Sequence, residues 1–172
     1  MKKMLCSLMT VIITVSLMAN NVYAMSHNPD DYTSVEMYSE LLPPSAHVST
    51  AHESAQLRGD FFLNADLIII DNSNGDIGAF AKAYMSIPVD EIYITLYLDR
   101  WDADADRWRQ VAYYDAEFYA KDYPDGLTDP TLNITFKNQQ KGYYYRLRGV
   151  FGAIHDGKFE GFSPVTDGIL IK

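Results

Sequence analysis

Cysteine is almost absent from this chain: the only one, Cys6, lies in the apolar N-terminal stretch. The rest of the chain therefore has no disulfide and no thiol nucleophile. Basic residues are also scarce, since 14 Lys and Arg stand against 23 Asp and Glu, for a formal charge of −9. This charge keeps a protein soluble, and it repels phosphate backbones and anionic lipid headgroups. Nucleic acid and membrane surfaces are therefore poor partner candidates.

The motifs of common enzymes are missing as well. The chain has no Gly-x-Ser-x-Gly, no Walker loop and no His-Glu-x-x-His. The four histidines do not have the spacing of a metal site, since three lie in the N-terminal third and His155 lies in a turn. We therefore expect no enzyme. A small secreted hydrolase with two carboxylates remains an alternative, because the sequence does not show which acids face each other.

The first 24 residues have the pattern of a signal peptide. Lys2 and Lys3 precede an apolar run over 4–19, and Val22-Tyr23-Ala24 places small side chains where a signal peptidase cleaves. The run is short for a membrane span. We expect cleavage after Ala24, export, and no membrane insertion of the mature chain, whose formal charge becomes about −11 without the two lysines.

An N-terminal arm is predicted over residues 25–58. Asn28 can cap a helix, Pro29 suits its first position, and two prolines stop the pattern after Leu42, which together predict a short helix over 29–42. The following Ser, Thr, Ala and His residues up to Ser54 show no periodicity and are typical of a linker.

Residues 59–172 predict an all-β domain, because the hydrophobic period changes to two. One face of the clearest strand carries Ile92, Ile94, Leu96 and Leu98, and the other carries Tyr93, Thr95 and Tyr97. Asn-Gly and Asp-Gly pairs mark hairpin turns at 74–75 and 156–157, and Pro164 interrupts the last strand region, 158–171. About seven strands with regular turns predict a single antiparallel β-sandwich.

The segment Gly142-Tyr143-Tyr144-Tyr145-Arg146-Leu147-Arg148-Gly149-Val150 resembles the sixth strand of a fibronectin type III domain, an immunoglobulin-like β-sandwich. The kinked stretch from Gly161 to Val165 looks like the last strand of that family. This resemblance implies that Tyr143 is the corner tyrosine, whose hydroxyl bonds back to the preceding backbone. It implies a fold and no function.

Over residues 54–172 the chain also looks like a family of small secreted Gram-positive bacterial proteins of unknown function. The similarity rests on Val89-Asp90-Glu91-Ile92, Asp122-Tyr123-Pro124 and Lys141-Gly142-Tyr143-Tyr144. This chain is more acidic and less rich in Ser, Thr and Gly than that pattern. No catalytic or binding residue is carried over from it.

An acidic loop offers a candidate cation site. Asp102, Asp104 and Asp106 alternate along it and could direct three carboxylates at one Ca²⁺, as the early positions of an EF-hand loop do. Arg107 stands where that loop needs glycine, and Tyr113 where it needs glutamate. The competing interpretation is a solvated hairpin tip without any cofactor.

Aromatic residues near this loop suggest a second candidate site. They are Tyr93, Tyr97, Trp101 and Trp108, with Tyr113 and Tyr114 close by. On an outward sheet face they could stack on sugar rings or anchor a protein partner; otherwise they pack in the core or at its rim. We therefore expect a secreted, non-catalytic extracellular binding module with a protein or cell-wall partner. A carbohydrate-binding module is the first alternative.

Overall fold

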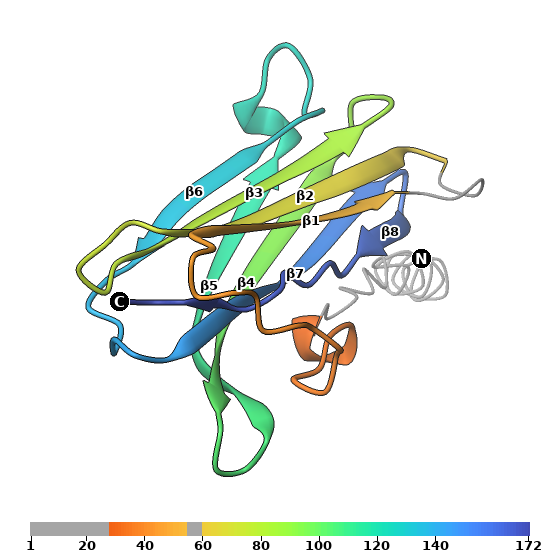
Figure 1. Cartoon of the computed structure of the whole chain (residues 1–172). Coiled ribbons are helices and arrows are strands. Elements are labelled where there is room, and N and C mark those ends of the chain that lie inside the picture. The colour runs from red at the N-terminus through yellow and green to blue at the C-terminus, as the bar shows by residue number, and fades with distance from the viewer. Residues whose placement is uncertain (1–27, 55–59) are drawn as a thin grey trace, which may run out of the picture.

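A computed structural model describes residues 28–54 and 60–172 (Figure 1), and the predicted signal peptide lies outside these residues. Within them the chain is all-β, with two antiparallel sheets stacked on each other and only two short 3₁₀ turns. This confirms the predicted fold class at the level of an antiparallel, sandwich-like structure.

The first sheet has the strand order β1-β2-β3-β6. Its strands are β1 (Val48–Ser54), β2 (Phe62–Asp71), β3 (Ile77–Met85) and β6 (Thr131–Phe136). The second sheet has the order β5-β4-β7-β8, with β9 also paired to β7. Its strands are β4 (Glu91–Asp102), β5 (Arg107–Tyr119), β7 (Tyr144–His155), β8 (Lys158–Phe162) and β9 (Ile169–Leu170). The 3₁₀ turns are η1 (Pro29–Asp31) and η2 (Ala120–Asp122).

The tight turns lie where the sequence predicts them. Between β2 and β3, Asn74 and Gly75 have φ of 58° and 82°, and between β7 and β8, Asp156 and Gly157 have φ of 50° and 73°. Two successive positive φ values match the right-handed twist of a hairpin. A Cβ on Gly75 would lie 2.5 Å from the carbonyl oxygen of Gln139, so this turn requires glycine.

The core lies between the sheets and uses every second residue of their central strands. On β4, all four predicted inward residues are fully buried, and Leu67, Ile69 and Ile77 meet them from the first sheet. Each such side chain contributes about 1.5–3 kcal/mol on burial. The final strand region is divided as predicted, since β8 and β9 both pair with β7 on either side of Pro164.

Two predictions for the arm are wrong. The helix over 29–42 is only the turn η1, in which the Asp30 amide donates to Asn28 Oδ1 at 3.3 Å. The linker over 45–54 contains β1, which pairs along its whole length with β2. Small polar residues suffice there because β1 is an edge strand, with its outward side chains in solvent.

Candidate functional site

A buried ionic cluster lies on the outer face of the five-stranded sheet. Asp99 of β4 and Arg146 and Arg148 of β7 are all buried there. The Nε atoms of Arg146 and Arg148 donate to Asp99 Oδ2 at 3.0 and 2.7 Å, and Nη2 of Arg148 donates to Oδ1 at 3.1 Å. Burial lowers the pKa of Arg146, while the neighbouring Asp99 opposes that shift. One carboxylate thus serves two guanidinium groups, which leaves further N–H groups to be satisfied.

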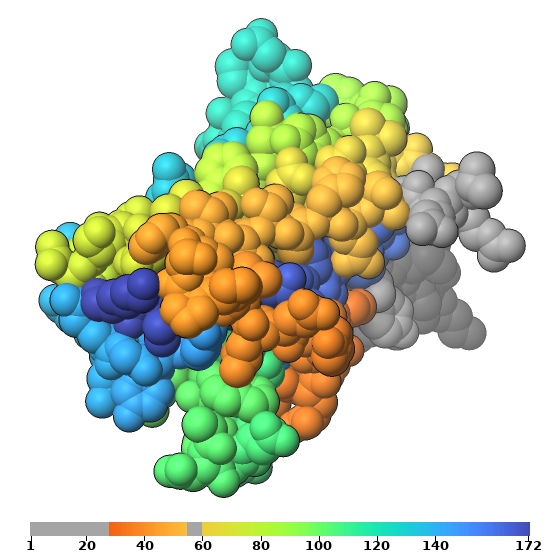
Figure 2. All heavy atoms as spheres, in the orientation of Figure 1, coloured from red at the N-terminus to blue at the C-terminus, as the bar shows by residue number. Residues whose placement is uncertain are grey.

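The N-terminal arm supplies those acceptors. Arg146 donates to the main-chain carbonyl oxygens of Met37 and Val35 at 2.6 and 2.8 Å. Arg148 donates to Thr33 Oγ1 of the arm at 3.2 Å, and it also donates to Gln110 Oε1 of β5 at 3.0 Å. The arm therefore lies across this face instead of standing away from it, and Figure 2 shows it seated on the body of the molecule.

Two of the predicted sugar-stacking aromatics close the cluster. Arg146 lies 4.5 Å from the ring centre of Trp108, and Arg148 lies 4.6 Å from that of Tyr97. Tyr97 also donates its hydroxyl to Asp30 Oδ1 at 2.6 Å, and burial raises its pKa. Tyr97 and Trp108 are only 4% and 6% exposed. These two rings are structural parts of the arm contact and are not available to a ligand.

The other two predicted aromatics are half-buried. Tyr93 donates to Glu91, and burial raises the pKa of its hydroxyl. Trp101 packs edge-on against Trp108 with 5.3 Å between ring centres. The four residues therefore do not form an exposed flat platform, which favours the other interpretation, that these aromatic residues pack in the core or at its rim. The signal that could have revealed this was the presence of Asp99 and two arginines on the same outward face as the rings.

The predicted calcium loop is a hairpin tip between β4 and β5. Asp102 accepts from Arg109 Nε at 2.5 Å and from the Ala105 amide at 3.2 Å. The bond with Arg109 lowers the pKa of Asp102. In the part of the chain that the structure describes, the three loop carboxylates do not meet within ligand distance of one another. The geometry supports the solvated hairpin rather than the cation site.

A different set of possible ligands does meet. Asp90, His155 and Asp156 have ligand atoms within 4.8 Å of one another, the only such group among residues 28–54 and 60–172. Asp90 Oδ2 already accepts the Asp156 amide at 2.8 Å. A metal-bound histidine normally donates its other ring N–H to an acceptor, whereas Nδ1 of His155 is buried without a hydrogen-bond partner. The cluster therefore fits a turn stabilised by Asp90 better than a metal centre.

Tyr145, and not Tyr143, makes the hydroxyl-to-backbone hydrogen bond that the resemblance implies. The Tyr145 hydroxyl donates to the carbonyl oxygen of Gln140 at 2.9 Å, and its ring is buried. Tyr143 is partly exposed, and Arg100 lies over its ring at 4.8 Å. The sequence-based prediction chose Tyr143 instead of Tyr145. Residues two positions apart along a strand point to the same face, so the alternating pattern does not distinguish these two tyrosines.

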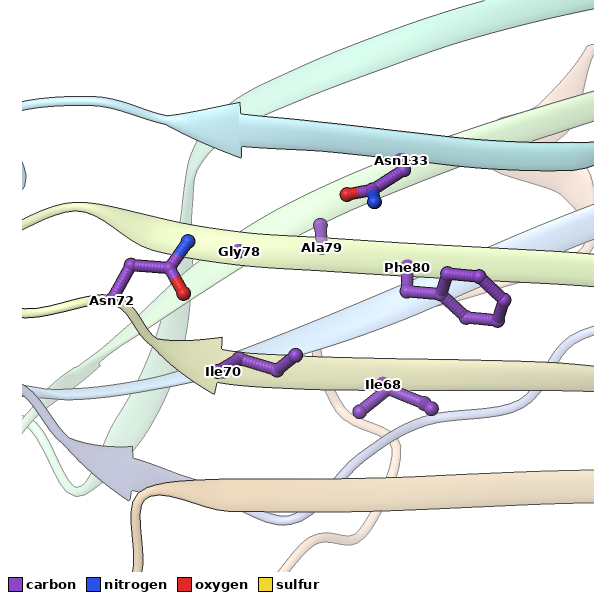
Figure 3. Close-up of a pocket in the computed structure, with 7 residues that line it drawn as sticks. All are labelled: Ile68, Ile70, Asn72, Gly78, Ala79, Phe80 and Asn133. Carbon is purple, nitrogen blue, oxygen red and sulfur yellow. The ribbon is translucent and has the colours of Figure 1, made fainter.

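The outer face of the other sheet holds a hollow that the sequence did not reveal. It has a volume of about 370 Å³. It is lined by Ile68, Ile70, Asn72, Gly78, Ala79, Phe80 and Asn133. Figure 3 shows the two asparagines on opposite sides of β3, with the isoleucines along β2 and Phe80 at one end.

Strand register explains the hollow. Gly78 stands between Ile70 of β2 and Thr135 of β6, so the middle of this row has no side chain of its own, and the amide of Asn72 lies over that position. The next row pairs Ile68 with Phe80 and Phe80 with Asn133. The floor is therefore apolar, and the two amide groups at the rim can each donate and accept.

No protein-family model matches the chain, and no curated protein matches it either. Among residues 28–54 and 60–172, no helix is long and apolar enough to cross a bilayer.

Proposed function

We propose that the protein is an exported, non-catalytic binding module, and that its ligand contacts the outer face of the β1-β2-β3-β6 sheet. The observation that carries this proposal is the hollow over Gly78, with its apolar floor and amide rim. Concave apolar surfaces with a few placed polar groups are the usual form of a ligand site. The opposite outer face is occupied by the arm and offers less room.

The chemistry of the hollow favours an uncharged ligand. None of its seven lining residues is ionisable. The amides of Asn72 and Asn133 suit hydroxyl or peptide groups, and Phe80 with the two isoleucines suits an apolar surface. An apolar side chain of an extracellular protein meets these requirements. A neutral cell-wall glycan is the second candidate, because an aromatic ring beside amide groups is the combination that contacts a sugar ring and its hydroxyls.

The fold proposed for this module is the fibronectin type III type of β-sandwich. Two features support it: β7 carries the residues of the resemblance in a central position of its sheet, and Tyr145 makes the backbone contact of a corner tyrosine. Export with cleavage after Ala24 is part of the same proposal, and N-terminal sequencing of the protein recovered from culture medium tests it.

The binding proposal is tested with the purified mature chain on a glycan array and in pull-downs with cell-wall preparations and extracellular proteins. Phe80→Ser and Asn133→Ala are expected to weaken saturable binding by about tenfold or more each, in the range of interface hot spots. Tyr38→Ser, in the exposed part of the arm and away from the hollow, is the matched control and should bind normally. Binding that survives Phe80→Ser but fails in the control would contradict the proposal.

A further inference from the structure

Apolar side chains surround the hollow on the outer face of the β1-β2-β3-β6 sheet. Val48 of β1 is 49% exposed, and Ile68, Ile70 and Phe80 on the two neighbouring strands are half-buried. All four point away from the core, because the strand registers place them in the rows that contain Gly78 and its outward neighbour. Adjacent apolar groups on an outer face of this kind mark an interaction surface.

The outward side of β3 is complementary to itself in shape and in charge. In chain order its residues are Asp76, just before the strand, then Gly78, Phe80 and Lys82, and they stand at equal distances on either side of Ala79. Gly78 lies in the hollow, and Phe80 projects beside it (Figure 3). The two end residues carry opposite charges. A half-turn about an axis above Ala79 therefore exchanges projection with hollow and acid with base.

The neighbouring strands obey the same half-turn. The row of strand partners that contains Ala79 crosses both β2 and β6 and marks the axis there. On β2 the outward residues on either side of this row are Ile68 and Ile70, so apolar groups exchange with apolar groups. On β6 they are Asn133 and Thr135, so an amide exchanges with a hydroxyl group, and the two can form hydrogen bonds.

We propose that two copies of the chain pack through this face about a twofold axis that crosses the strands above Ala79, and that Phe80 of each copy fills the hollow of the other. This inference rests on the proposed function, because it names a second copy as the extracellular protein whose apolar side chain enters the hollow. A twofold contact uses the same surface on both copies. The facing sheets would lie about 10 Å apart with their strands within about 30° of each other.

The charges and the shape of β3 select this register. Lys82 of each copy comes to lie near Asp76 of the other. Within its own chain Lys82 pairs with Asp129 at 3.2 Å, and its ammonium group has further N–H donors for a second carboxylate. An axis moved by one residue, onto Phe80, would set the two phenylalanine rings against each other and leave both hollows empty. The contact is therefore specific for the axis above Ala79.

The test is sedimentation velocity of the mature chain and of two variants in the hollow. The unaltered chain should pass from monomer to dimer between about 1 μM and about 1 mM. Gly78→Leu fills the hollow and Phe80→Ala removes the side chain that enters it, so each variant alone should dimerise at least about tenfold more weakly. An equimolar mixture should form a heterodimer, because the leucine and the phenylalanine of the first variant each face a small residue of the second.

Gly78→Leu is compatible with the fold. The atom nearest to a Cβ at this position is Nδ2 of Asn72, at 2.8 Å, which is the end of a flexible side chain. Lys82→Glu is a further variant outside the hollow, and it should also weaken the dimer because it sets acid against acid. Tyr38→Ala, on the exposed arm, is the matched control for Phe80→Ala and should dimerise like the unaltered chain.

The inference is overturned if the unaltered chain stays monomeric up to about 1 mM, if Gly78→Leu or Phe80→Ala dimerises normally, or if their mixture stays monomeric. A monomeric chain that binds a glycan or another protein through Phe80 would overturn the dimer and leave the proposed function standing. A chain in which neither dimerisation nor ligand binding depends on Phe80 would overturn both.

Discussion

Asp99 is the residue on which the arm contact depends most. It is fully buried and accepts hydrogen bonds from two arginines, each of which also reaches the arm. Buried ion pairs contribute little net stability compared with apolar packing, but they fix one arrangement of the groups around them. Here that arrangement holds the main chain at Val35 and Met37 against the sheet.

Asp99→Asn should therefore be strongly destabilising. The substitution leaves two buried guanidinium groups without a carboxylate, and removing one partner of a buried ion pair costs about 3–5 kcal/mol. Urea unfolding measures the change in the free energy of unfolding. Asp102→Asn is the control, since that carboxylate pairs with Arg109 at the surface and its loss should have a small effect. Equal effects of the two substitutions would show that the cluster is not buried as described.

The two tyrosines of β7 make a second comparison of single residues. Tyr145→Phe removes the hydroxyl that donates to Gln140 and should cost about 1–2 kcal/mol, the usual effect of losing a buried hydrogen bond. Tyr143→Phe should leave the free energy of unfolding nearly unchanged, because the Arg100 contact involves its ring. Thermal and urea unfolding measure the loss in the free energy of unfolding for both variants. A larger loss for Tyr143→Phe than for Tyr145→Phe would favour the sequence-based assignment of Tyr143.

At the scale of elements, the arm behaves as part of the sandwich. Besides the arginine contacts, the Leu42 amide donates to the Gly168 carbonyl oxygen at 2.9 Å and the Gly168 amide donates to Glu40 at 2.7 Å. A chain that begins at Pro43 should therefore unfold at a clearly lower temperature than one that begins at Asn28, because Arg146 loses the carbonyl oxygens of Val35 and Met37 and Arg148 loses the Thr33 hydroxyl. Differential scanning calorimetry measures this difference. Equal melting temperatures would mean that the arm adds no stability.

The elements that the sequence predicts well are those with a local signal. Strand β4 alternates apolar and polar residues, and the Asn-Gly and Asp-Gly turns need positive φ, so both can be read without knowing the fold. Strand β1 lacks such a signal, since its small polar residues are acceptable only because β2 is beside it. The helix prediction failed for a similar reason: Arg146 and Arg148 bond to the arm from about 110 residues away.

The candidate sites were less predictable than the fold. The hollow depends on the register of three strands around Gly78, which no single segment shows. The strand alternation places Tyr93 and Tyr97 on the face opposite the core residues, but it does not show that the arm covers Tyr97 there. Which outer face is open is a property of how distant segments pack, and it is decided only in the folded chain.

For the whole molecule, the net charge opposes self-association. Each copy carries a formal charge of −9, so two copies repel each other at long range. Salt screens this repulsion over about 10 Å at 0.1 M and about 30 Å at 0.01 M. Charges in direct contact are screened less than charges farther apart.

Self-association of the chain should therefore be stronger at about 0.15 M NaCl than at about 0.01 M, because salt screens the long-range repulsion between two acidic copies. Sedimentation velocity at fixed protein concentration measures the dimer fraction along a salt series. Asp31→Lys, which lowers the net negative charge, should associate more than the unaltered chain at low salt and should depend less on the salt concentration. A dimer fraction that falls steadily with salt would mean instead that the contact pairs outweigh the net charge of the molecule.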